Sequence, residues 1–251
     1  LLDALLDKGY RYAMTANSDN LGAAPSARIA GWFAASGAPY APEMCWRTPA
    51  DVKGGHLAVR KSDGRIILRD TAQTPEDQMH YFTDQFRHPF FHTNNLWFDL
   101  EVLRDTLADR GGILGLPLIR NSKTVDPADS SSTPVIQLET AMGAAVEAFE
   151  GATAIEVPRS RFLPVKTTND LLLVRSDVYE VDDDGLLQMV PDQACTVSLD
   201  PRFYKKIQDF EARFPDGVPS IKDAQSLTVE GDWTFGADVV ATGEAHVEAE
   251  G

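Results

Sequence analysis

The sequence predicts a mixed α/β domain followed by the start of a parallel β-solenoid. Strand-like and helix-like segments alternate up to about residue 195, as in layered α/β domains. Beyond residue 226, two sets of apolar residues recur every six positions, namely Leu227, Trp233, Val239 and Ala245, and Val229, Phe235, Ala241 and Val247. Glycines punctuate this rhythm, which is typical of β-helices. Only about three and a half repeats are present, so a β-meander fits the same pattern.

The composition is that of a globular protein. Of 251 residues, 43% are hydrophobic and 24% charged, and no apolar run approaches the ~18 residues of a membrane span. The net charge of −15 makes nucleic acids and anionic membranes poor partners. Cys45 and Cys195 lie far apart without CxxC spacing, which favours unpaired thiols, a reducing compartment and therefore a cytoplasmic location.

In the first third of the chain, alternating apolar side chains predict strands joined by polar turns. Residues 10–16 alternate as a buried strand, and the polar residues 17–22 form a turn that could cap a helix beginning near Ala23. Residues 57–60 and 65–69 predict a hairpin, because turn-forming residues separate them.

The rest of the chain predicts two helices, one strand and one hairpin. Residues 137–150 and 203–214 carry apolar side chains at helical spacing, and the second of these helices could join two domains. The apolar run 171–175 predicts a strand. Residues 178–181 and 186–190 predict a hairpin across a triple-aspartate turn. A solvated turn suits these aspartates better than a metal site, because no other ligand converges on them.

One segment concentrates positive charge in this acidic chain. Residues 158–168, PRSRFLPVKTT, hold three cations, Arg159, Arg161 and Lys166, together with three hydroxyls and two prolines. Rigid Arg and Lys donors suit phosphate oxyanions, because charge-assisted hydrogen bonds are strong and a stiff loop loses little entropy. Surface ion pairs with Asp or Glu explain the same charge equally well.

Polar side chains follow the first predicted strand. Asp19 lies just past its end, where open α/β sheets place ligand-binding groups, and could hold Mg²⁺ beside Asn17. A turn or N-cap role for Asp19 fits as well. The segment HTNNLW at residues 92–97 offers amides, which pair well with sugar hydroxyls because each supplies a donor and an acceptor.

Together these segments make the chain resemble the eukaryotic-type UDP-glucose pyrophosphorylases, the UTP–glucose-1-phosphate uridylyltransferase family. The matching segments run in order along nearly the whole chain: NSDNLGA at 17–23, ADVKGG at 50–55, TNNLW at 93–97, IQLETA at 136–141 and VPRSRFLPVKTT at 157–168. The resemblance implies a partial Rossmann-like, GT-A-like nucleotidyltransferase domain over residues 1–199. It implies a linker helix and the start of a left-handed β-helix over residues 200–251.

The resemblance also implies roles for individual residues. Asp19 matches the family's magnesium-binding aspartate, and Lys166 matches the lysine that contacts the phosphates. Asn17 matches an asparagine close to the nucleotide sugar. The positions expected to contact the sugar are Gly55, Asp70 and Asn94. The family's arginines correspond to Arg159 and Arg161, which either bind the substrate or are structural.

Three departures from the family pattern stand out. Asp70 replaces the more usual Glu. His92 stands where many members carry Asn, which alters either hydroxyl contacts or only the packing of the loop. The family's glycine-rich nucleotide loop belongs upstream of residue 1, and the β-helix continues beyond residue 251 in the family, so the chain resembles a fragment.

The implied reaction is Mg²⁺-dependent, reversible uridylyl transfer from UTP to glucose 1-phosphate, giving UDP-glucose and pyrophosphate. We expect the chain alone to be inactive, since it lacks the nucleotide loop and leaves an open sheet edge. Two alternatives remain: a broader UDP-sugar or UDP-N-acetylhexosamine pyrophosphorylase, and a non-catalytic sugar-nucleotide-binding remnant. The β-helix could also mediate homo-oligomerisation.

Overall fold

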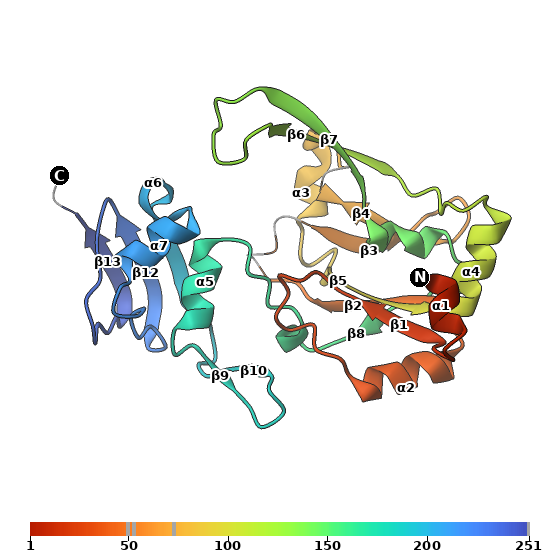
Figure 1. Cartoon of the computed structure of the whole chain (residues 1–251), viewed down its shortest axis with the longest axis horizontal. Coiled ribbons are helices and arrows are strands. Elements are labelled where there is room, and N and C mark those ends of the chain that lie inside the picture. Colours follow the sequence, from red (N-terminus) through yellow and green to blue (C-terminus); the bar gives the residue numbers. More distant parts are fainter. Residues whose placement is uncertain (49–50, 52–53, 72–73, 250–251) are drawn as a thin grey trace. The chain divides into compact units, whose positions relative to one another are not determined.

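The structure is a computed structural model that describes residues 1–48, 51, 54–71 and 74–249. Ala50, Val52 and Lys53 of the family-matching segment ADVKGG lie outside the described residues. The chain divides into two compact units (Figure 1). Unit 1 comprises Leu1–Asn17 and Pro25–Arg159, and unit 2 comprises Ser18–Ala24 and Ser160–Gly251.

Unit 1 is built on a four-stranded sheet. Its strands, in spatial order, are β1 (Tyr12–Thr15), β5 (Phe90–Asp99), β2 (Tyr40–Trp46) and β8 (Ile155–Glu156). Strand β5 runs antiparallel to both of its neighbours, and β2 runs parallel to β8. The strand predicted at residues 10–16 is confirmed as β1, but it is half-buried rather than buried.

The two longer helices of unit 1 each begin at a capping side chain. Helix α2 (Ala27–Ser36) begins later than the predicted start near Ala23, because Ser26 accepts a first-turn N–H at 3.3 Å and acts as the N-cap. Helix α4 (Leu100–Asp109) begins after Asp99, whose carboxylate accepts two first-turn N–H groups. These caps fix where the chain leaves the sheet.

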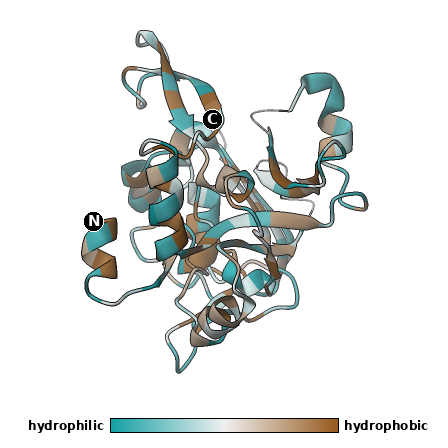
Figure 2. Ribbon diagram, turned by 90° about the vertical axis from the view of Figure 1, so that its right-hand side faces the viewer, coloured by the Kyte–Doolittle hydropathy of each residue, from teal (hydrophilic) through white to brown (hydrophobic). Residues whose placement is uncertain are grey.

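A hydrophobic core supports the sheet of unit 1. Its fully buried members include Tyr40 and Leu96. Helix α1 (Leu2–Leu6) carries both hydrophobic and hydrophilic stretches in Figure 2, and its leucines at positions 2, 5 and 6 pack on this core. The core therefore lies beneath β5, the strand that holds the segment TNNLW.

The hairpin predicted at residues 57–60 and 65–69 is confirmed. Strand β3 (Gly55–Val59) pairs antiparallel with β4 (Ile66–Asp70), and Gly55 lies opposite Asp70 in the register. The short helices η2 (Glu76–Gln78) and α3 (Met79–Phe82) then lead towards β5.

The helix predicted over residues 137–150 is wrong. Strand β7 (Pro134–Thr140) pairs antiparallel with β6 (Leu118–Thr124), and only the 3₁₀ segment η3 (Met142–Glu147) follows. The β-ladder with β6 uses the backbone groups of residues 134–140, so they cannot serve a helix.

The elements from residue 159 onward are η4 (Arg159–Arg161), α5 (Thr168–Arg175), β9 (Tyr179–Val181), β10 (Leu187–Met189), β11 (Thr196–Leu199), α6 (Pro201–Tyr204), α7 (Ile207–Arg213), β12 (Ala224–Glu230) and β13 (Gly243–Glu248). The predicted hairpin across the aspartate turn is confirmed, because β9 and β10 pair antiparallel.

Two predictions for unit 2 are wrong. The run 171–175 is helical in α5, because the Asp170 carboxylate accepts the N–H of Thr167 at 2.8 Å and closes a capping box. The helix predicted over residues 203–214 is two helices, α6 and α7, because Lys206 between them is extended.

A three-stranded parallel sheet, in the order β11-β12-β13, forms the end of unit 2. Leu227 pairs with Ala245 and Val229 with Val247, so partners lie three of the six-residue repeats apart. This pairing is parallel, which rules out an antiparallel meander here. The predicted border at residues 199 and 200 falls between the paired strands β11 and β12.

Candidate substrate site

Unit 1 brings together two of the predicted sugar-contacting amides. Asn17 follows β1, and Asn94 lies within β5 in the left-handed conformation, with φ 61°. The Nδ2 of Asn94 donates to the Oδ1 of Asn17 at 2.7 Å. Asn17 is exposed and Asn94 half-buried, so this amide pair is accessible to hydrogen-bonding ligands.

Gly55 and Asp70 form a second predicted pair in unit 1. They are register partners in the β3–β4 hairpin. A Cβ at Gly55 would lie 2.8 Å from Leu68 Cδ1 and 3.1 Å from the carbonyl oxygen of Arg69, so a side chain does not fit without displacement. The hairpin is therefore closely packed around Gly55, which is itself buried, and its predicted contact with the sugar stays a prediction.

His92 contributes to the Asn94 loop through its ring. Its Nδ1 accepts the N–H of Asn94 at 3.1 Å, and the imidazole packs against Gly143, where a Cβ would lie 2.8 Å from His92 Cε1. Burial lowers the pKa of His92 to about 4. The ring is therefore neutral at pH 7 and supports the backbone at Asn94.

Unit 2 holds Asp19 and Lys166 on two adjoining backbone segments. The carbonyl oxygen of Asp19 accepts the N–H of Val165 at 2.9 Å, and Asn20 forms a β-bridge with Pro164. The Asn20 side chain, 5% exposed, reinforces the junction because its Oδ1 accepts the N–H of Leu163 at 2.8 Å. Asp19 and the residue preceding Lys166 are thus joined directly.

The Asp19 carboxylate has one oxygen that could bind a cation. Its Oδ1 is buried and accepts no hydrogen bond within the described part of the chain. Across those same residues, no group of three or more His, Cys, Asp and Glu side chains could hold a metal by itself. A cation at Asp19 would therefore take most of its oxygen ligands from phosphate and water, as nucleotide-bound Mg²⁺ does.

Lys166 is exposed, and its backbone is anchored. Its N–H donates to the Asp170 carboxylate at 3.0 Å, the same group that caps α5. Among residues 1–48, 51, 54–71 and 74–249, its ammonium makes no ion pair. An unpaired ammonium on a fixed backbone is suited to an anionic ligand.

The two predicted arginines hold loops within their own units. Arg159 forms a bidentate ion pair with Asp51, at 2.6 Å and 3.0 Å, and Asp51 also accepts the N–H of Thr48. Arg161 donates from Nη1 to the carbonyl oxygen of Ala24 at 3.0 Å. These contacts give both arginines a structural role, and their predicted contacts with the substrate stay predictions.

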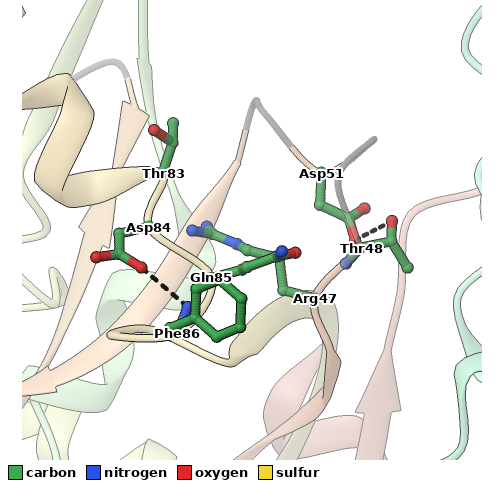
Figure 3. Close-up of a pocket in the computed structure, with 7 residues that line it drawn as sticks. All are labelled: Arg47, Thr48, Asp51, Thr83, Asp84, Gln85 and Phe86. Atoms are coloured by element: carbon green, nitrogen blue, oxygen red, sulfur yellow. Dashed lines mark hydrogen bonds between the residues drawn. The ribbon is translucent and has the colours of Figure 1, made fainter.

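A cavity of about 320 Å³ lies in unit 1. Its lining residues are Arg47, Thr48, Asp51, Thr83, Asp84, Gln85 and Phe86 (Figure 3). Figure 3 shows Asp51 accepting hydrogen bonds from Thr48, and Asp84 accepting the N–H of Phe86. None of these residues was predicted to contact a substrate, and the carboxylates of the cavity are engaged in its own loops.

One group near the predicted site was missed by sequence reasoning. Glu43, in the middle of β2, is fully buried, and its carboxylate accepts hydrogen bonds from Asn95 and Trp97 of the segment TNNLW. The signal that could have found it is an acidic residue inside the otherwise apolar strand YAPEMCW, since buried carboxylates occur almost only where they are paired.

No helix among the described residues combines the length and apolarity that a membrane crossing requires.

Comparisons with known proteins define the class of this chain first. A family model described as UTP–glucose-1-phosphate uridylyltransferase matches residues 1–241. The chain is 40% identical over 252 residues to an enzyme of that name from Solanum tuberosum, and 41% identical over 251 residues to one from Hordeum vulgare. These relatives are nucleotidyltransferases, and 99% of the chain is covered in each case.

Solved structures agree with this class. A UDP-glucose phosphorylase from Trypanosoma brucei matches with a TM-score of 0.88 and 44% identity, covering 98% of this chain and 53% of that one. A mutant UDP-glucose pyrophosphorylase from Leishmania major, in complex with UDP-glucose, matches with a TM-score of 0.85 and 45% identity. The match covers 98% of this chain and 54% of the Leishmania major chain.

The chain belongs to the UTP–glucose-1-phosphate uridylyltransferase family. It spans about half the length of the curated relatives it matches, 50% and 51% for the two plant enzymes. The mixed α/β fold expected from the sequence is confirmed by the structure and by these matches.

Proposed function

We propose that the protein carrying this chain transfers a uridylyl group from UTP to glucose 1-phosphate, releasing UDP-glucose and pyrophosphate. The observation that carries this proposal is the family match, which runs through every predicted site residue from Asn17 to Lys166. The Asn17–Asn94 amide pair and the unpaired ammonium of Lys166 support it, since the first suits a sugar and the second a phosphate.

The chemistry asks little of general acids or bases. The attacking phosphate oxygen of glucose 1-phosphate is already an anion, so catalysis rests on alignment and on neutralising charge. Lys166 would stabilise negative charge on the phosphates, while Asn17 and Asn94 would orient the sugar. Mg²⁺ held through Asp19 would supply further charge neutralisation when bound.

Two structural points belong to the same proposal. The parallel pairing of β12 and β13, offset by three six-residue repeats, supports our proposal that a left-handed β-helix begins here. Residues 1–199 correspond to the nucleotidyltransferase domain of the family. A cytoplasmic location agrees with Cys45 and Cys195, which are both free and buried.

Sugar selectivity tests the proposal against a broader UDP-sugar or UDP-N-acetylhexosamine pyrophosphorylase. The protein expressed from the complete open reading frame is given UTP with glucose 1-phosphate, galactose 1-phosphate or N-acetylglucosamine 1-phosphate. We expect the highest kcat/KM with glucose 1-phosphate. A higher value with either competitor would replace the proposal by the broader activity.

A further inference from the structure

Glu43 is a charged residue with no contact to water. Its exposed fraction is 0%, and it lies at the centre of strand β2. A carboxylate in this position is costly unless its oxygens are hydrogen-bonded. Its partners therefore indicate what the charge is for.

Three hydrogen-bond donors to Glu43 come from the segment TNNLW of strand β5. Its Oε2 accepts from Asn95 Nδ2 at 3.0 Å, and its Oε1 accepts from Trp97 Nε1 at 2.9 Å. Its carbonyl oxygen accepts from Thr93 Oγ1 at 2.8 Å. Glu43 of β2 thus accepts hydrogen bonds from residues on both sides of Asn94.

These contacts coincide with a bulge in the sheet. Pro42 pairs with Leu96 and Met44 pairs with His92, so residues 93–95 of β5 all lie opposite Glu43. Within the bulge, Asn94 has φ 61°, in the left-handed region that asparagine tolerates better than most residues with a side chain.

We propose that Glu43 is a positioning residue for sugar recognition, rather than only a stabiliser of the sheet. By fixing Thr93, Asn95 and Trp97, it holds the bulge that turns the Asn94 carboxamide towards Asn17. The group it serves is a hexose hydroxyl of the sugar nucleotide. This inference rests on the proposed function, since it assigns Asn94 to the sugar.

The Glu43→Gln variant tests this role because it keeps the shape of the side chain. Both carboxylate partners are N–H donors, so an amide nitrogen in place of one oxygen opposes one of them. The matched control is Glu156→Gln in neighbouring strand β8. Glu156 also accepts an indole N–H, from Trp46 at 2.8 Å, but it is exposed and lies in a different strand from TNNLW.

The readout is the ratio of affinities for UDP-glucose and UDP, measured by calorimetry on the complete protein. A merely structural role would weaken both ligands together, whereas a positioning role weakens the one that carries the sugar. We expect Glu43→Gln to lower the preference for UDP-glucose about tenfold, the effect of losing one hydrogen bond to a charged group, with UDP affinity unchanged. Glu156→Gln should leave the ratio unchanged.

An unchanged ratio in folded Glu43→Gln, or equal weakening of both ligands, would overturn the inference. If Glu43→Gln does not fold, Thr93→Val removes the third contact without disturbing a charge and must lower the ratio in the same direction. If the wild-type protein binds UDP and UDP-glucose equally, the proposed sugar site itself fails.

In that case the side-chain amide resonances of Asn17 and Asn94 still decide whether Glu43 sets their geometry. A shift of both resonances in Glu43→Gln, and in neither under Glu156→Gln, would support a positioning role for Glu43. Unshifted resonances would contradict it.

Discussion

The two residues proposed to bind a cation and a phosphate are held by backbone hydrogen bonds. Asp19 is fixed through its carbonyl oxygen to Val165, and Lys166 through its N–H to Asp170. Their side-chain functional groups are thereby left for other partners, since no described residue occupies Asp19 Oδ1 or the Lys166 ammonium. This separation of anchoring from chemistry makes single substitutions informative.

Lys166→Ala should remove transition-state stabilisation without unfolding unit 2. We expect kcat/KM to fall on the order of 10² to 10³-fold. This corresponds to a loss of about 3 kcal/mol of transition-state stabilisation, the scale of one lost electrostatic donor. Steady-state pyrophosphate release measures it. The control is Lys205→Ala, an exposed lysine of the same unit that should leave turnover intact. Near-normal turnover of the Lys166 variant would contradict the proposed role of Lys166 in stabilising the phosphates.

Two buried histidines should make stability depend on pH. Burial, and then neighbouring His88 and Arg47, lower the pKa of His56 to about 3, and burial lowers that of His92 to about 4. Both native pKa values lie below the value of 6.5 expected for histidine in the unfolded chain. At a pH between the native and the unfolded pKa, the unfolded state therefore binds protons that the native state does not.

The free energy of unfolding is therefore not reduced by these histidines above about pH 6.5, and it decreases as the pH falls below that value. Each histidine adds a slope of up to about 1.4 kcal/mol per pH unit, which denaturant titrations between about pH 5 and pH 7 can measure. The double variant His56→Gln, His92→Asn should flatten the curve, and the exposed His246→Gln should not. An equally steep curve in the double variant would contradict this account.

At the scale of elements, the junction that carries Asp19 depends on a glycine. A Cβ at Gly22 would lie 2.6 Å from the carbonyl carbon of Arg161 and would also contact the carbonyl oxygen of Ser160. Gly22→Ala should therefore lower the free energy of unfolding by about 1–3 kcal/mol. Gly31→Ala, inside α2 with no atom within 4 Å of the new methyl group, should instead raise it by about 0.5–1 kcal/mol. Equal effects in chemical denaturation would argue against this close approach.

Elements with simple local signals could be predicted from the sequence. The β3–β4 and β9–β10 hairpins follow from alternation and turn residues, and both are confirmed. The helix over residues 137–150 failed because the apolar spacing was coincidental: Leu138 is 59% exposed, whereas Val146 and Phe149 are buried by tertiary packing. A ladder with β6, distant in sequence, decided the outcome, and periodicity within one segment carries no information about such a partner.

The α5 error had a local remedy. Thr167 and Asp170 form the pattern [ST]-x-x-[DE] ahead of an apolar run, the signature of a capping box, and the structure contains that box. The site shows the same division. Asn17 and Asn94 could be proposed from the sequence, and the structure joins them. Glu43 could not be linked to them, because the bulge that connects it to TNNLW exists only in the folded sheet.

At the scale of the whole molecule, each unit has its own hydrophobic core. One cluster of buried residues contains Tyr40 and Leu96, the other contains Leu227 and Val229, and among the described residues the two clusters have no member in common. A cavity in one cluster should therefore be felt mainly by the elements around it.

Leu227→Ala tests this separation. Leu227 is 1% exposed, and its truncation should cost about 2–5 kcal/mol. Hydrogen exchange should show faster exchange in β12 and β13, with unchanged protection in β2 and β5. The control Val240→Ala, at a residue 63% exposed, should change neither. Equal loss of protection in both sets of strands would show that the two cores unfold as one.

The central claim is that this chain forms part of a working uridylyltransferase. The most direct test is to measure pyrophosphate release from UTP and glucose 1-phosphate by the protein expressed from the complete open reading frame. We predict steady turnover that requires both substrates and whose kcat/KM falls on the order of 10² to 10³-fold in the Lys166→Ala variant. Binding of UDP-glucose without any release of pyrophosphate would contradict the claim and identify a sugar-nucleotide-binding protein instead.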